Sequence, residues 1–209
     1  MIKSRLTMTV PSVLAVAALS VVLTPVTVHA KPVAARHTTA GVIFDFENGI
    51  QGWSGGKGTL FSQDTKGATT GSHSLKIANY NGAFAWIGSD KAGKDTAAKL
   101  HNAPSLYFDI TFPSDVALKK DKNGHQWFTF ILATIGANGK WNQGQGMASV
   151  PAKNGVVKAG TYPLAIAMTG ENRSFISGPS MRISIGPGTS GLAHPIAFYI
   201  DSVRTTPRP

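Results

Sequence analysis

Strict alternation of apolar and polar residues in several short segments is the feature that most constrains the fold. In the segment 104–112 every second residue from Leu106 to Phe112 is large and apolar, and the same period recurs in 126–135 and 181–186. A period of two is that of a β-strand with one buried face. Gly, Ser, Thr, Asn and Pro separate these segments at short intervals, and no convincing amphipathic helix lies between them. The pattern predicts an all-β fold, a two-sheet antiparallel β-sandwich.

Segments rich in aromatic and β-branched residues mark the expected strands. They are 42–47, 59–63, 74–79, 83–88, 104–112, 126–135, 146–150, 161–169, 181–186 and 196–205. The first and the last of them both place a carboxylate opposite aromatic residues, which suggests that they close one domain on itself.

The first 30 residues have the pattern of a secretory signal peptide. Lys3 and Arg5 precede an apolar run, 13–23, and Val28-His29-Ala30 forms a small-x-small cleavage site after Pro25. The run is shorter than the roughly 20 apolar residues of a membrane span; an uncleaved anchor is the alternative. We expect a signal peptide at 1–30, a flexible lead-in at 31–40 and one domain at 41–205. The expected location is secreted or periplasmic, with no membrane contact after cleavage.

The chain contains no cysteine, so an exported domain of this size depends on its core or on a bound metal for stability. Its formal net charge is +10, but the lysines are spread out, and only Lys119, Lys120 and Lys122 cluster, in an expected loop. No nucleic-acid-binding motif accompanies them, so nucleic acid is not an expected partner. A basic surface does suit an acidic polysaccharide.

The polar side of the alternating strands is expected to face outward. Its members are Tyr107, Asp109, Trp127, Thr129, Arg182 and Ser184. One face of an antiparallel sandwich can remain open to water. If the three strands share a sheet, that face carries two aromatic rings, an acid and a guanidinium. Alternation indicates the side of each residue and leaves open which strands are neighbours.

Four motifs in order resemble carbohydrate-binding modules of the β-jelly-roll, galactose-binding-like type. They are Phe44-Asp45-Phe46-Glu47-Asn48-Gly49 with Gly52-Trp53, then Gly71-Ser72-His73-Ser74-Leu75-Lys76-Ile77, Gly160-Thr161-Tyr162-Pro163-Leu164 and Phe198-Tyr199-Ile200-Asp201-Ser202-Val203. The resemblance covers the whole expected domain. It implies a jelly roll that binds a poly- or oligosaccharide without catalysis, as a monomer, with Trp53 packed under the first turn.

The resemblance also implies a structural calcium ion between the first and last strands. Glu47 and Asp201 would be its side-chain ligands, with backbone carbonyls from the turn at 69–72. Calcium takes six to eight oxygen ligands, which carboxylates and carbonyls supply. The alternative is that both acids are ordinary polar residues, paired with Lys or Arg.

Sugar recognition requires aromatic rings for the apolar face of the sugar and planar polar groups for its hydroxyls. The candidate rings are Trp86, Tyr107, Trp127 and Trp141. The candidate polar partners are Asp109, Asn142, Gln143 and Arg182. For each aromatic residue, simple packing is the alternative.

Three other functions remain open. A hydrolase needs two carboxylates flanking the scissile bond, and Asp109 with Glu171 is the most plausible pair, although no known catalytic signature is present. A polysaccharide lyase can instead use groups such as Tyr107, His125 and Arg182. A surface or assembly protein that uses the sandwich for protein contacts is the third possibility.

Overall fold

The computed structural model describes residues 41–56, 58–82, 87–89, 99–135, 141–142, 146–168, 170 and 182–208. The chain divides into two units, Met1–Arg36 and His37–Pro209, and every described residue belongs to the second. The predicted signal peptide at 1–30 and lead-in at 31–40 lie outside the described residues. Within the described ranges, no helix has the length and hydropathy needed to cross a membrane.

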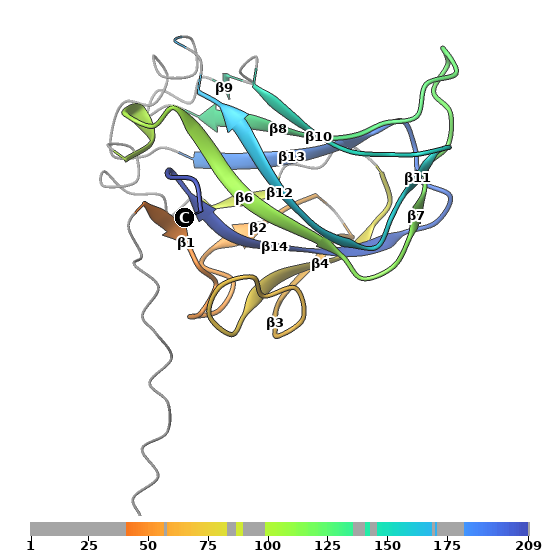
Figure 1. Cartoon of the computed structure of the whole chain (residues 1–209). Helices are drawn as coiled ribbons and strands as arrows, with labels where there is room; N and C mark the ends of the chain where they lie inside the picture. Colours follow the sequence, from red (N-terminus) through yellow and green to blue (C-terminus); the bar gives the residue numbers. More distant parts are fainter. Residues whose placement is uncertain are drawn as a thin grey trace, which may run out of the picture. The chain divides into compact units, whose positions relative to one another are not determined.

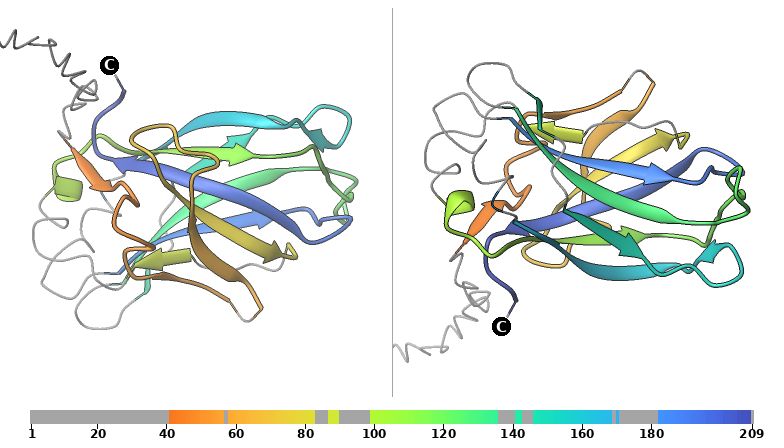
Figure 2. Two further views of the ribbon diagram at one scale, coloured as in Figure 1. Left: turned by 90° about the horizontal axis from the view of Figure 1, so that it is seen from below. Right: turned by 90° about the horizontal axis from the view of Figure 1, so that it is seen from above.

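Two antiparallel sheets form the described unit, as Figures 1 and 2 show. Sheet I has the order β12 (Gly160–Ala167), β6 (Ser105–Phe112), β14 (Ile196–Arg204), β4 (Ser74–Tyr80) and β3 (Leu60–Asp64), with β1 (Val42–Phe44) paired to β14. Sheet II has the order β10 (Met147–Val150), β8 (Phe128–Ile135), β13 (Arg182–Thr189), β5 (Ile87–Ser89) and β2 (Trp53–Ser54), with β9 (Trp141–Asn142) paired to β8. A small third sheet pairs β7 (Val116–Ala117) with β11 (Val156–Val157). The predicted two-sheet sandwich is confirmed.

Aromatic side chains from both sheets meet in the core. Phe112 of sheet I packs edge-on against Phe128 of sheet II with 5.3 Å between ring centroids, and Phe108 packs edge-on against Phe130 at 5.7 Å. Phe198 of β14 contacts Phe130 at 5.9 Å. All five side chains are buried. Edge-on aromatic pairs add about 0.5–1.5 kcal/mol each to the free energy gained by burial, so this cluster joins the two layers.

The first and last strands of the described unit pair with each other, which agrees with the expectation that they close one domain. Val42 is opposite Arg204 and Phe44 is opposite Val203, and Figure 1 shows β1 at the end of the sandwich where β14 finishes. β1 is shorter than expected because Phe46, two residues beyond it, has a φ of 57°. Trp53 is buried and packs edge-on against Phe44 at 5.4 Å, in agreement with its predicted packing role.

The three strands whose polar sides were expected to face outward do not all lie in one sheet. β8 and β13 are neighbours in sheet II, with Arg182 opposite Ile135, but β6 lies in sheet I between β12 and β14. The condition for one shared open face is therefore not met, because Tyr107 and Asp109 lie on the other sheet. Asp109 of β6 is only 1% exposed, so the expectation that it faces water is also wrong. Alternation indicated which side of β6 it lies on, but not that another segment covers that side.

Candidate functional site

The segment 65–73, which joins β3 to β4, covers part of the outer side of sheet I. Two glycines allow this close approach. At Gly67, with a φ of 76°, a Cβ atom would overlap the side chain of Tyr199 on β14. At Gly71, with a φ of 66°, a Cβ atom would overlap the carboxylate of Glu47. Both positions combine a left-handed backbone with a lack of space, so glycine is required at each.

Asp201 of β14 is fully buried beneath this segment. Its Oδ2 atom accepts the backbone N–H groups of Thr69 at 2.7 Å and Thr70 at 2.9 Å. Its Oδ1 atom accepts the N–H of Ser202 at 2.7 Å. Burial raises the pKa of Asp201 above its ordinary value, although the hydrogen bonds from Thr69, Thr70 and Ser202 act in the opposite direction.

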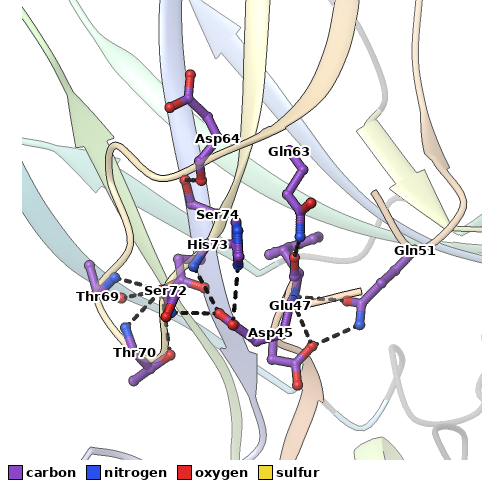
Figure 3. A network of polar contacts seen from close by, with 12 residues as sticks. Asp45, Glu47, Gln51, Gln63, Asp64, Thr69, Thr70, Ser72, His73 and Ser74 are labelled. Atoms are coloured by element: carbon purple, nitrogen blue, oxygen red, sulfur yellow. Dashed lines mark hydrogen bonds and ion pairs between the residues drawn. The ribbon is translucent and has the colours of Figure 1, made fainter. Parts of the chain in front are cut away.

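Glu47 receives the next pair of N–H groups in the same segment. Its Oε1 atom accepts from Ser72 N at 2.8 Å and His73 N at 2.9 Å, and the His73 Nδ1 atom is 3.3 Å from Oε2. Figure 3 shows how these residues lie around the Glu47 carboxylate. Burial alone would raise the pKa of Glu47, but the hydrogen bonds from Ser72 and His73 outweigh it and lower the pKa below its ordinary value. The ionised form is thus the form that the segment binds.

A third acid, Asp109, completes the network from β6. Its Oδ2 atom accepts hydrogen bonds from Arg208 Nη2 at 2.7 Å, Arg204 Nη1 at 3.2 Å and the Thr69 hydroxyl at 2.8 Å. Arg204 Nη1 also donates to the carbonyl of Ser202 at 2.7 Å. We call these groups together the clasp: Glu47, Asp109, Asp201, the segment 69–73, Arg204 and Arg208.

The clasp does not fit the expected calcium ion. The structure brings Glu47 and Asp201 to one turn, as the resemblance implied, but the turn presents N–H groups to both carboxylates. Calcium requires oxygen ligands, and an ionised carboxylate has about four lone-pair sites. Asp201 accepts hydrogen bonds on Oδ2 from the N–H groups of Thr69 and Thr70 and from the Thr69 hydroxyl, and on Oδ1 from the N–H of Ser202. In the described part of the chain, no group of three or more acidic or histidine side chains is placed to hold a metal.

The outer face of sheet II carries the other candidate site. Phe128 and Phe130 are buried in the core, so the alternate positions of β8, Thr129 and Ile131, belong to the outer side. Met147 of β10 lies opposite Ile131 and is 60% exposed. The smallest residues of this face lie on β13, where Gly186 and Gly188 are opposite Ile131 and Thr129.

Trp127 immediately precedes β8 and is 37% exposed. Its backbone carbonyl accepts from Ser190 N at 3.0 Å, which extends the β8–β13 pairing by one residue. Its indole N–H donates to Asp121 Oδ2 at 3.4 Å. Asp121 in turn accepts the backbone N–H groups of Asn123 and His125, both at 2.8 Å. A large aromatic side chain is therefore held at the protein surface by a hydrogen-bonded turn.

Three predicted site residues lie at the other end of the β8 strand. Trp141 on β9 and Arg182 on β13 both pair with Ile135 of β8. Trp141, Ile135 and Arg182 therefore form one row across the sheet. Trp141 and Arg182 are two strand spacings apart, about 10 Å. Asn142 pairs with Thr134 in the adjacent row.

The predicted sugar-binding set is thus divided. Trp127, Trp141, Asn142 and Arg182 belong to sheet II or its edge, whereas Tyr107 and Asp109 belong to sheet I. Tyr107 is half-buried and lies opposite Ala165 and Arg204. Trp86, Gln143 and the alternative hydrolase residue Glu171 lie outside the described residues.

Sequence reasoning missed several residues of both sites. Arg204 and Arg208 follow the last predicted apolar positions, and their pairing with Asp109 spans about half the chain, so no local pattern reveals it. The turn Thr69-Thr70-Gly71-Ser72-His73 did carry a signal. Small polar residues around a glycine are typical of turns whose N–H groups bind a carboxylate.

Comparisons with known proteins show the fold. No family model matches the chain, and no curated protein sequence is similar to it. A carbohydrate-binding module, CBM28, described as specific for non-crystalline cellulose, matches with a TM-score of 0.53 and 14% identity over 80% of this chain and 94% of that one. An exo-β-agarase matches with a TM-score of 0.50 and 18% identity over 81% of this chain but only 25% of the agarase. The CBM27-1 module of Caldicellulosiruptor saccharolyticus, solved with mannohexaose, has a TM-score of 0.44, 15% identity, and coverage of 78% and 95%. The chain has the jelly-roll sandwich fold of carbohydrate-binding modules.

Proposed function

We propose that this chain is an exported, monomeric protein that binds a poly- or oligosaccharide on the outer face of sheet II and does not cleave it. The fold is shared with a module described as specific for non-crystalline cellulose, which supports a glycan as the ligand class. The observation that carries the proposal is the exposure of Trp127, immediately before the first residue of β8.

Trp127 has the properties of a stacking platform for a sugar. The hydrogen bond from its indole N–H to Asp121 restricts the orientation of the ring. An aromatic ring stacks on the C–H face of a sugar with little loss of side-chain entropy when it is already oriented. Asp121 and His125, in the turn beside it, supply polar groups for sugar hydroxyls.

The length of β8 suggests a ligand of several sugar units. Trp127 and Ile135 are eight residues apart, about 27 Å along an extended strand. Ile135 is the centre of the row that contains Trp141 and Arg182. A chain bound along this strand would therefore meet candidate ligand residues at both of its ends, and we expect long oligosaccharides to bind more tightly than short ones.

The neighbouring carboxylates of Asp109 and Asp201 are not accessible to a substrate. Asp109 and Asp201 face each other across β6 and β14, but both are buried and hydrogen-bonded to protein donors. A glycosidase needs two carboxylates that reach the scissile bond from opposite sides. Asp109 and Asp201 lie on sheet I and bind groups of the protein itself, whereas Trp127 lies beside β8 of sheet II.

Affinity electrophoresis against neutral and acidic polysaccharides, followed by calorimetry on any that retard the protein, tests the proposal. Trp127→Ala should weaken binding by about tenfold or more, equivalent to about 1.4 kcal/mol. Leu60→Ala is the matched control, because Leu60 is an exposed apolar residue, 59% accessible, on β3 of sheet I. Equal affinity of both variants and the wild type would show that Trp127 is not part of the binding site. New reducing ends or unsaturated products would favour the hydrolase or lyase, and no retardation by any glycan would favour the protein-contact role.

A further inference from the structure

The turn at 69–73 binds anions in two successive places. Thr69 and Thr70 direct consecutive backbone N–H groups at Asp201, and Ser72 and His73 direct the next consecutive pair at Glu47. Gly71, in the left-handed conformation, separates the two pairs. Consecutive N–H groups in such a turn form a concavity of positive potential, which attracts a carboxylate and repels a cation.

The positive charge that balances the buried acids comes from the protein itself. Asp109 and Asp201 are direct partners in neighbouring strands, and Asp109 forms ion pairs with Arg204 and Arg208. Arg204 is nearly buried, whereas Arg208 reaches Asp109 from beyond the end of β14. A metal ion beside Asp109 would lie next to two guanidinium groups, which repel it.

From these contacts we propose that the clasp closes the domain without a metal ion. Two pairs of backbone N–H groups and two arginines stabilise this end of the domain, as calcium was expected to do. The carboxylates of Glu47 and Asp201 hold the 69–73 turn against β14, and the Arg204 and Arg208 side chains neutralise Asp109. The stability of the fold is therefore independent of calcium, and Arg208 is a structural residue.

Two buried atoms of the clasp have no partner among the described residues, and they agree with this assignment. Asp109 Oδ1 is an acceptor and Arg204 Nε is a donor, both shielded from solvent. An acceptor and a donor are groups of opposite polarity, and one buried water can satisfy both when it lies between them. A cation could satisfy only the acceptor, and it would face the guanidinium of Arg204.

Thermal unfolding of the full chain with chelator, with millimolar calcium and with millimolar magnesium tests the proposal directly. A cation that binds only the folded state raises Tm by about 5–10 °C at a hundredfold excess over its Kd. We expect the three unfolding curves to coincide. A saturable rise with calcium that disappears in Glu47→Gln would overturn the proposal.

Arg208 provides the second test. Arg208→Gln should lower Tm by several degrees, with calcium giving no recovery, and Arg208→Lys should restore part of the loss because it keeps the charge. Lys158→Gln is the matched control, since Lys158 forms an exposed ion pair with Asp115 at 2.7 Å, and exposed pairs add little stability. Equal Tm values for Arg208→Gln and Lys158→Gln would refute the assignment of the arginine, and rescue of Arg208→Gln by calcium would refute the metal-free clasp.

Discussion

Asp109 and Asp201 face each other across β6 and β14, and the hydroxyl of Thr69 lies 2.8 Å from a carboxylate oxygen of each. The hydroxyl has one proton to share between two acids. Two like charges buried side by side destabilise a fold unless neighbouring donors and cations offset them. Here the N–H groups of the 69–73 turn and the two arginines of the clasp have that effect.

Thr69→Val should destabilise the domain. It removes the hydroxyl that links the two acids while preserving side-chain shape, and the loss of a hydrogen bond to a charged group costs about 1.5–3 kcal/mol. Urea unfolding measures the difference. Thr70→Val is the control, because the Thr70 hydroxyl is 3.4 Å from Asp201 and its bond is weak; a cost as large as that of Thr69→Val would contradict this view of the network.

The stability contributed by Glu47 should disappear in acid. Its pKa is lowered in the folded state, so its contribution is fully present above the ordinary value of 4.5 and is lost as pH falls through the lower, folded value. The wild type should exceed Glu47→Gln in stability by about 1–2 kcal/mol at neutral pH, and the two should converge in strong acid. Denaturant unfolding at a series of pH values provides the measurement. A difference that stays constant with pH would show that the charge of Glu47 is not involved.

Gly71→Ala should cost more than Gly49→Ala. Both glycines have positive φ, 66° and 86°, but nothing lies within 4 Å of a Cβ atom at Gly49, whereas one at Gly71 would overlap Glu47. We expect about 1 kcal/mol at Gly49 from backbone strain alone, and about 3 kcal/mol or more at Gly71. Equal losses in chemical denaturation would mean that the turn can move away from Glu47 at no cost.

Tyr80 should remain un-ionised in alkali until the domain unfolds. It is buried, and its hydroxyl donates to the carbonyl of Pro187 at 3.0 Å. Burial raises the pKa of Tyr80, so its contribution to stability is present below the unfolded pKa of about 10 and is lost as pH rises above it. Tyr80→Phe should be less stable at neutral pH by about 1–2 kcal/mol and should lose less stability above pH 10. Ultraviolet tyrosinate titration beside circular dichroism follows both events, and ionisation of Tyr80 before unfolding would contradict its burial.

The fold could be predicted because each long strand carries its own signal. The alternation along 104–112 and 126–135 corresponds to β6 and β8, and the paired first and last strands were expected from their aromatic residues. The end of β13 was predicted too early because Gly186-Pro187-Gly188 resembles a break. In the described structure β5 pairs only with Ile183 to Ile185, so Pro187 lies beyond that pairing, where a missing N–H is tolerated.

The sites could be predicted only in part. The whole fold decides which strands are neighbours and which segments cover a strand. The side of β6 on which Asp109 lies was predicted correctly. Thr69 and Arg208, which enclose it, come from segments far away in the chain. The polarity of the 69–73 turn depends on backbone angles that residue types alone do not specify. Trp127 was found because its neighbour, Phe128, is a core residue, and that relation is local.

The central place of β14 in sheet I has a consequence for how the chain acquires its structure. β14 separates β6 from β4 and also pairs with β1, so residues 196–204 are the shared partner of three earlier strands. During synthesis those strands emerge before the segment that joins them, and contacts so distant in sequence form slowly. Sheet I can therefore be completed only when β14 is available, which makes the joining of β6 to β4 a late step in folding.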